Sequence, residues 1–470
     1  ASAADFKKIP GSPIAYWAHR SIHDIFESSH KLEEFAEPRH GMSTGNNDEM
    51  LRLWHEVYLR DIGFKYDSHS DFLKSSCKWL PYNKGGNKRK WYGNNDYVLR
   101  YDAYGIDKLK TFTGFRIDSK QYFFQPGITW SSLTSSHFHA RAFEKGFVFD
   151  AKGQCCFLNE DYKDKRYNLL GYLNSSLSNY LLGMLSPTLD YNSGIIRKLP
   201  LKSKVLNYPE ISDFVFNMVQ LSIEEWDSRE TSWDFKANEL LKHKTSNKIE
   251  DAYKNYCDYW KNEFFELHKN EEELNQIFIE IYNLEDELSP NVPLEEITIL
   301  SDETEIKDGK VVFKKDVIIK QLISYAVGCM FGRYSIDKKG LILANQGEEL
   351  ADFKEKVPGA SFLPDEDNII PILDDEYYTD DIVGRFKEFL KLTFGADTLS
   401  ENLDFIAGAL SKKGEASEKV IRDYFLRDFY KDHVRMYKKR PIYWLFTSGK
   451  KRCSMRSFTC TGTIRPLWQR

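Results

Sequence analysis

The spacing of apolar residues in the first part of the chain predicts one helix before a region of short strands. In the stretch EMLRLWHEVYLR, residues 49–60, Leu51, Trp54 and Val57 recur every three positions, as on one face of an amphipathic helix. The Gly- and Asn-rich run before it offers an N-cap from Asn46 or one of the next two residues. We therefore expect a capped helix over 49–60.

Between residues 66 and 205 the apolar runs are short and are separated by Gly and Asn, which is typical of strands and loops. Examples are WYGNNDYVLRY, TFTGFRI, YFFQPGITW and GFVFD. The stretch NLLGYLNSSLSNYLLGML, residues 168–185, instead carries Leu, Tyr and Met on one helical face until Pro187 stops it. The pattern predicts a β-rich module closed by one packed helix.

The second half of the chain has mainly helical periodicity. It is helical and acidic from about 208 to 288, and a Pro-containing linker, SPNVPLEE, follows. A short strand, KVVF, a helix capped by Asp316, a loop-rich stretch and three further helices complete it. We therefore predict a multidomain α+β protein with a long helical spacer and an α-rich C-terminal domain. The four predicted domains are residues 1–65, 66–205, 206–289 and 290–470.

Charge is distributed unevenly along the chain. Residues 78–145 contain 12 Lys and Arg against 5 Asp and Glu, whereas residues 206–310 contain 10 against 26. A basic segment followed by an acidic one suits a polyanion-binding module beside a solvated spacer. Two ordinary soluble surfaces would show the same contrast, so charge alone leaves both interpretations open.

Composition argues against a disordered protein, a disulfide-rich or zinc-ribbon protein and a membrane-spanning protein. The chain is 41% hydrophobic and 15% aromatic, which argues against wholesale disorder, and its seven cysteines are scattered without a CxxC pair. The most apolar stretch, DVIIKQLISYAVGCMFG, is about 17 residues long and contains Lys320 and Gln321, so it falls short of a membrane span. We expect a protein of the reducing cytoplasm, with no membrane partner.

The motifs of most enzymes are missing. The sequence has no GxGxxG after a strand, no GxxxxGK[ST], no HExxH and no GxSxG. His19 and His23 have a metal-compatible spacing but no third ligand nearby, and His137 and His139 would point to opposite faces of a strand. We therefore predict no catalytic, cofactor-binding or metal-binding residue in this chain.

A binding surface fits the sequence better. The segment KWLPYNKGGNKRKWYGNNDY interleaves cations, aromatics and flexible glycines, and PGITWSSLTSSHFHAR adds hydroxyls and an arginine. Lysines that engage phosphates release counterions, hydroxyls suit phosphates or base edges, and arginine suits guanine. A solvated basic loop and a polar turn remain open as alternatives. The DNA-binding residues that we predict are Lys84, Lys88, Arg89, Lys90, Arg116, Thr129, Ser131, Ser132, Ser135 and Arg141.

Several longer blocks resemble a known family. They are GMSTGNNDEMLRLWHEV, GITWSSLTSSHFHARAFEKGFVFD, LLGYLNSSLSNYLLGMLSPTLDYNSGIIRKLP, ETSWDF, ISYAVGCMFGRYSIDKKGLILANQGE and KKRPIYWLFTSGK. Together, from about residue 5 to 452, they resemble the C-terminal half of the PglX family, the adenine-specific DNA methyltransferases of type 1 BREX phage-defence systems. The first and third blocks also resemble the target-recognition half of type IIG restriction–modification enzymes.

The resemblance implies a modification enzyme that transfers a methyl group from S-adenosylmethionine to adenine N6 in double-stranded DNA, flipping the base to reach it. The family's [ND]PPY motif and cofactor loop are absent from this chain, so we expect it to be inactive alone. Residues 1–65 would be the tail of the methylase domain and 66–205 the target-recognition domain. The implied partners are DNA, an N-terminal methyltransferase half and other BREX proteins.

The resemblance ends near Cys453. The family continues there with an apolar helix, whereas this chain reads SMRSFTCTGTIRPLWQR, and restoring a single T after the Cys453 codon gives a family-like sequence. We therefore expect residues 454–470 to be a frameshifted end.

Two other functions stay open beside DNA recognition. A protein–protein docking scaffold within the defence complex would use residues 206–470 rather than the basic segment. A stand-alone nuclease of the type IIG kind is disfavoured by the missing motifs.

Overall fold

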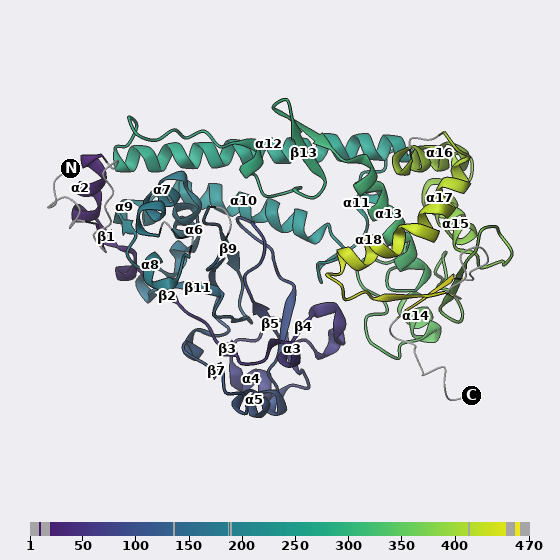
Figure 1. The fold of residues 1–470 in the computed structure, drawn as a ribbon, viewed down its shortest axis with the longest axis horizontal. Helices are drawn as coiled ribbons and strands as arrows, with labels where there is room; N and C mark the ends of the chain where they lie inside the picture. Colours follow the sequence, from purple (N-terminus) through teal and green to yellow (C-terminus); the bar gives the residue numbers. More distant parts are fainter. Residues whose placement is uncertain are drawn as a thin grey trace. The chain divides into compact units, whose positions relative to one another are not determined.

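The computed structural model describes residues 9–10, 19–134, 137–186, 188, 190–411 and 414–447, and the backbone of 456–460. The chain divides into two compact units. Unit 1 comprises Ala1–Arg52, Arg60–Trp226 and Glu263–Ile299, and unit 2 comprises Leu53–Leu59, Asp227–Asn262 and Leu300–Arg470. Helices and several small sheets occur together, which confirms a mixed α+β protein (Figure 1). The four predicted domains stay a prediction, because this division groups residues differently.

Two four-stranded sheets contain most of the β-structure between residues 36 and 158. One has the order β10-β5-β6-β4 and the other β2-β11-β8-β9. In the second sheet Trp130 faces Gln154 on one neighbour and Ala140 on the other, in antiparallel register. The strand bounds are β2 Ala36–Arg39, β4 Leu51–Leu53, β5 Trp79–Asn83, β6 Tyr97–Arg100, β8 Gly127–Ser131, β9 Ala140–Phe143, β10 Val148–Phe149 and β11 Gly153–Leu158.

Shorter elements of unit 1 connect and flank these sheets. Two-stranded pairs join β1 (His30–Lys31) to β12 (Pro200–Leu201) and β3 (Ser43–Thr44) to β7 (Phe115–Arg116). The helices before residue 210 are α2 Arg20–Ser28, α3 Asn47–Met50, α4 His69–Lys74, α5 Ala103–Lys110, α6 Arg166–Asn174, α7 Ser176–Leu185, α8 Ser193–Ile196 and α9 Ser203–Leu206.

The helix predicted over 168–185 is two helices. Ser175 has an extended backbone, with ψ 157°, and its side chain accepts a hydrogen bond from the amide of Ser178, so it ends α6 and caps α7. Helix α6 packs on β9 and β8 (Figure 1). Its Gly171 permits close packing, because a Cβ there would lie 2.7 Å from Val215 Cγ2 of α10 (Pro209–Asp227).

The predicted helix over 49–60 was wrong. Helix α3 spans only Asn47–Met50, with Asn46 as its N-cap as expected, and the chain continues into β4 and two 3₁₀ turns, Trp54–Glu56 and Leu59–Asp61. Leu51 and Trp54 are nevertheless buried, and Trp54 donates its Nε1–H to Thr231 O at 2.8 Å within unit 2.

Unit 2 is mainly helical. The predicted strand KVVF is β14 (Lys310–Phe313), which pairs with β13 (Thr304–Lys307). Asp316 lies in the first turn of the next helix but does not cap it, because the N-cap position is Lys314. The further helices are α11 Glu239–Lys242, α13 Lys315–Met330, α14 Leu350–Lys356, α15 Ile382–Phe394, α16 Leu399–Leu410, α17 Ser417–Arg427 and α18 Phe429–Met436.

The long helix α12 (Ile249–Tyr282) lies in the stretch that was predicted to be a helical spacer, and its residues belong to both units, divided after Asn262, so the spacer as a domain stays a prediction. A three-stranded sheet in unit 2 has the order β15-β17-β16, with β15 at Ile369–Ile372 and β16 at Tyr443–Thr447. Its central strand is the backbone of Arg456–Cys460, and the rest of the segment 454–470 lies outside the described residues. The frameshift stays a prediction.

Candidate nucleic-acid interface

The basic segment and the hydroxyl-rich segment meet in unit 1, as the sequence analysis expected. After β5 the chain turns through Gly85 and Gly86, whose φ angles of 92° and 135° favour glycine. Ser131 donates its hydroxyl to the carbonyl oxygen of Gly86 at 3.0 Å. The two segments therefore share one edge of the β-rich module.

Most cations of the basic segment face a carboxylate of the same unit. Lys84 Nζ lies 3.9 Å from Asp150, and Lys88 Nζ lies 2.8 Å from Glu296. Hydrogen bonding to His139 and Lys88 lowers the pKa of Glu296, so its carboxylate is ionised at neutral pH and holds Lys88. Lys84 and Lys88 remain partly exposed, and phosphates could compete for them.

Arg89 and Lys90 lie inside the unit. Arg89 is 9% exposed, pairs with Glu225 and lies with its guanidinium carbon 4.9 Å from the centre of the Trp226 ring. Lys90 is 7% exposed, and its Nζ donates to Glu271 at 2.6 Å. A buried ion must be paired, and opening such a pair costs several kcal/mol, roughly 3–5. In this structure both side chains stabilise the fold and are not available to DNA.

The backbone around these two residues is equally fixed. Trp91 donates its Nε1–H to Glu271 at 2.8 Å, and its backbone amide donates to Ala140 O at 3.0 Å. Ala142 N in turn donates to Trp91 O at 2.8 Å. The second half of the basic segment thus continues the sheet rather than forming a solvated loop.

Arg141, which we predicted to read guanine, is 2% exposed. Burial and the neighbouring charge of Arg89 lower the pKa of Arg141 to about 10. Its Nη1 donates to Arg89 O at 3.5 Å, and its Nε has no hydrogen-bond partner among the described residues. A direct base contact by Arg141 would require the surrounding sheet to open.

The predicted hydroxyl residues separate into buried and accessible groups. Thr129 is buried and donates to Gln154 O at 3.1 Å, and Ser132 is also buried, whereas Ser131 is half-buried at the edge. Arg116 is exposed on β7, on a different pair of strands. Ser135 lies outside the described residues. DNA contact by any of these residues stays a prediction.

The structure adds one residue that the sequence analysis missed. Lys152 is exposed, and its carbonyl oxygen accepts the backbone amide of Ser132 at 2.9 Å, which places it beside the hydroxyl segment. No local pattern marks it, because a single lysine in the turn AKGQ is unremarkable in sequence. We call Lys84, Lys88, Ser131 and Lys152 the basic edge.

Two further searches concern metal and membrane. Within the described ranges, no group of three or more His, Cys, Asp and Glu side chains could hold a metal ion. Across the same part of the chain, none of the helices has the length and apolar character needed to cross a bilayer.

Comparison with known proteins gives the family context. No family model matches the chain. It is 41% identical over 464 residues to the adenine-specific methyltransferase PglX of Lacticaseibacillus casei (strain Zhang), which covers 95% of this chain and 36% of the relative. It is 37% identical over 470 residues to the adenine-specific methyltransferase BrxX of Escherichia coli O9:H4 (strain HS), covering 97% and 37%.

The chain therefore spans just over a third of the length of these curated relatives. The resemblance to PglX is confirmed for that part of the relatives' length. The resemblance to type IIG enzymes stays a prediction.

Proposed function

We propose that this chain is the DNA-recognition part of a site-specific adenine-N6 DNA methyltransferase that marks host DNA in a BREX phage-defence system. The observation that carries the proposal is the similarity to two adenine-specific methyltransferases along nearly the whole chain. Because the chain lacks an [ND]PPY motif, the methylase chemistry and the S-adenosylmethionine site would lie in the remainder of the full-length protein.

The basic edge supports the proposal and limits the proposed phosphate contacts to a few lysines. Lys84, Lys88 and Lys152 bring partly exposed positive charge to the edge that carries the hydroxyl of Ser131, which suits a phosphate backbone. With Arg89, Lys90 and Arg141 buried, these lysines are the phosphate contacts that we propose for this face.

The test is DNA binding followed by fluorescence anisotropy across a salt series. The variant changes Lys84, Lys88 and Lys152 to Ala, and the control changes three exposed lysines of the same unit, Lys74, Lys110 and Lys163. Each lysine that contacts a phosphate adds about one to the slope of log K against log salt. We expect the basic-edge variant to lose about three from that slope and the control to keep it.

Equal slopes in the two variants would contradict the proposed interface, because both remove the same charge from unit 1. Circular dichroism of both proteins checks that the fold is kept.

A docking scaffold is the second candidate function. Tyr377 and Tyr378 of unit 2 are adjacent and exposed, and exposed aromatic side chains are enriched at protein–protein interfaces. Absence of DNA binding at low salt would favour this function over DNA recognition.

A further inference from the structure

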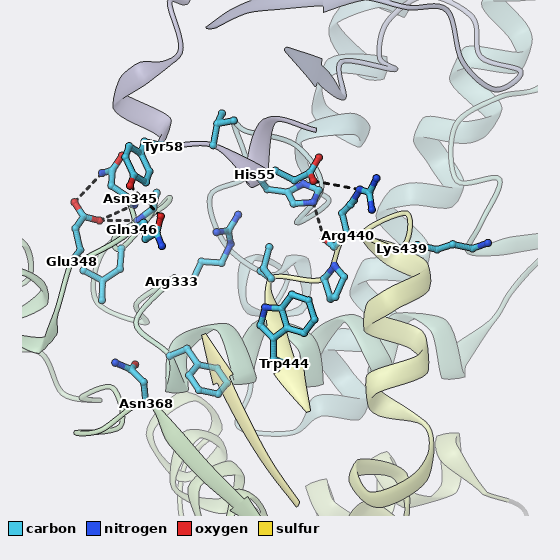
Figure 2. Close-up of a pocket in the computed structure, with 17 residues that line it drawn as sticks. His55, Tyr58, Arg333, Asn345, Gln346, Glu348, Asn368, Lys439, Arg440 and Trp444 are labelled. Atoms are coloured by element: carbon cyan, nitrogen blue, oxygen red, sulfur yellow. Dashed lines mark hydrogen bonds and ion pairs between the residues drawn. The ribbon is translucent and has the colours of Figure 1, made fainter. Parts of the chain in front are cut away.

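Unit 2 contains a cavity of about 410 Å³ that the proposed DNA interface does not use (Figure 2). Three segments and the single residue Asn368 line it; the segments are residues 55–58, the stretch from Phe331 to Glu348, and residues 439–444. The first segment is held in place by a hydrogen bond from Leu59 N to Ala344 O at 3.5 Å. The cavity is large enough for a small organic ligand, since such pockets start at about 300 Å³.

Arg333 provides a buried positive charge in this cavity. It follows Gly332, whose φ of 71° turns the chain out of α13, and it is 8% exposed. Figure 2 shows its guanidinium in the middle of the lining residues, between Gln346 and Trp444. Burial acts to lower the pKa of Arg333, but the phenol groups of Tyr334, Tyr437 and Tyr443 raise it by more, so the guanidinium stays charged.

The guanidinium of Arg333 has little of its hydrogen-bonding capacity satisfied. Its Nε donates to Tyr334 Oη at 3.4 Å, and within the described part of the chain its buried Nη2 has no hydrogen-bond partner. A nine-tenths buried guanidinium with an unsatisfied terminal nitrogen is suited to an oxyanion such as a phosphate.

The acidic side chains of the lining do not oppose an anion. Glu348 accepts hydrogen bonds from the amides of Ala344 and Asn345 and from Lys356 Nζ. Glu56 lies 3.4 Å from Arg440 Nε. Both lining carboxylates are therefore compensated. Glu230 is buried close to Arg333 but does not line the cavity, and burial raises the pKa of Glu230 to about 7, so near neutral pH it offsets the charge of Arg333 only in part.

The remaining lining suits an aromatic base. Trp444 on β16 is 43% exposed and borders the cavity, where its ring can stack. Gln346 accepts the hydroxyl hydrogen of Tyr58 through Oε1 at 3.0 Å, which leaves its amide nitrogen to donate. Asn345 and Asn368 add further amides to the lining.

We propose that this cavity binds a nucleoside monophosphate, with the phosphate on Arg333 and the base against Trp444. This site goes beyond the proposed DNA recognition, and it uses only residues of unit 2. Its failure and that of the basic edge are therefore distinguishable, because the two experiments change different residues and different ligands.

The test is isothermal titration calorimetry of the full chain with AMP and GMP, and separately with adenosine and with inorganic phosphate. The informative variant is Trp444→Ala, and its matched control is Phe446→Ala, an exposed aromatic two residues along the same strand that does not line the cavity. Arg333→Gln tests the phosphate contact. If that variant does not fold, Trp444→Ala and the ligand series still decide the question.

We expect AMP or GMP to bind with one site per chain, on the order of tenfold more tightly than adenosine or phosphate alone. Trp444→Ala should weaken binding by on the order of tenfold, and Phe446→Ala should not. A short single-stranded oligonucleotide that displaces AMP would identify nucleic acid as the natural source of the nucleotide, and failure to displace it a free nucleotide. Equal affinity for AMP and phosphate, equal loss in both Trp444 and Phe446 variants, or no binding at millimolar nucleotide would overturn the proposal.

Discussion

Glu230 makes the stability of unit 2 depend on pH. Its side chain is buried close to Ser324 and Arg333. Burial raises the pKa of Glu230 to about 7 from the usual 4.5, although the Ser324 hydroxyl and the positive charge of Arg333 act in the opposite direction. The carboxyl group is therefore held close to its titration point at neutral pH.

The sign and size of this pH effect follow from the difference between the pKa of Glu230 in the folded chain and its pKa in the unfolded chain. Below pH 4.5 Glu230 is protonated in both the folded and the unfolded chain and its titration changes nothing. As the pH rises from 4.5 to about 7, the unfolded chain loses the proton first, so the free energy of unfolding falls. Above about pH 7 the free energy of unfolding has fallen by its full amount, about 3 kcal/mol.

The perturbation is Glu230→Gln, which resembles the protonated side chain in shape and charge. We expect the variant to be more stable than the wild type, by an amount that grows by about 2 kcal/mol between pH 5 and pH 8. The assay is urea denaturation of both proteins at each pH. The difference between the two free energies of unfolding removes the contribution of every group that titrates in the same way in both proteins.

The control is Glu250→Gln, which removes one carboxylate from an exposed position of the same unit and leaves the buried site of Glu230 unchanged. A Glu230→Gln difference that stays constant from pH 5 to pH 8, or that shrinks as the pH rises, would refute the reasoning.

Two buried ion pairs give the remaining predictions. Arg422 donates to Asp381 through both terminal nitrogens, at 2.8 and 2.9 Å, so Arg422→Met should lower the free energy of unfolding by about 3–5 kcal/mol in urea denaturation. Lys90→Met should cost a similar amount because it leaves Glu271 charged and buried, and adding Glu271→Gln, which keeps an acceptor for Trp91, should restore most of the loss. A Lys90→Met protein as stable as the wild type, or a double variant no more stable than the single one, would show that the pair is not structural.

Long periodic elements were predictable from the sequence because their burial repeats along one face. The α12 spacer and the KVVF strand were found in this way. The break at Ser175 was missed. Serine is a common N-cap residue, and the side chain of Ser175 accepts a hydrogen bond from the backbone amide of Ser178. Hydrophobic spacing alone continues smoothly through such a break, because the two helices bury neighbouring faces of the same core.

The segment 49–60 shows the opposite error, in which apolar spacing predicted a helix that the structure does not contain. Its apolar residues do recur every three positions. However, a strand buries every second residue and a 3₁₀ turn every third, so β4 followed by a 3₁₀ turn gives a spacing similar to that of a helix. What decides the structure there is contact with distant residues, such as that between Trp54 and Thr231. The cavity around Arg333 could not be predicted either, because its walls come from segments near residues 55, 340, 368 and 440 that are far apart in the sequence.

The charge pattern misled the residue-level prediction for a related reason. The basic segment and the acidic segment were treated as two surfaces, one for DNA and one for solvent. In unit 1 they partly neutralise each other, since Glu225, Glu271 and Glu296 of the acidic segment pair with Arg89, Lys90 and Lys88. Local density of lysine and arginine therefore overestimates the charge that is free to meet a phosphate. If the basic edge is the DNA contact, the salt dependence of binding should reflect about three lysines, far fewer than the basic segment contains.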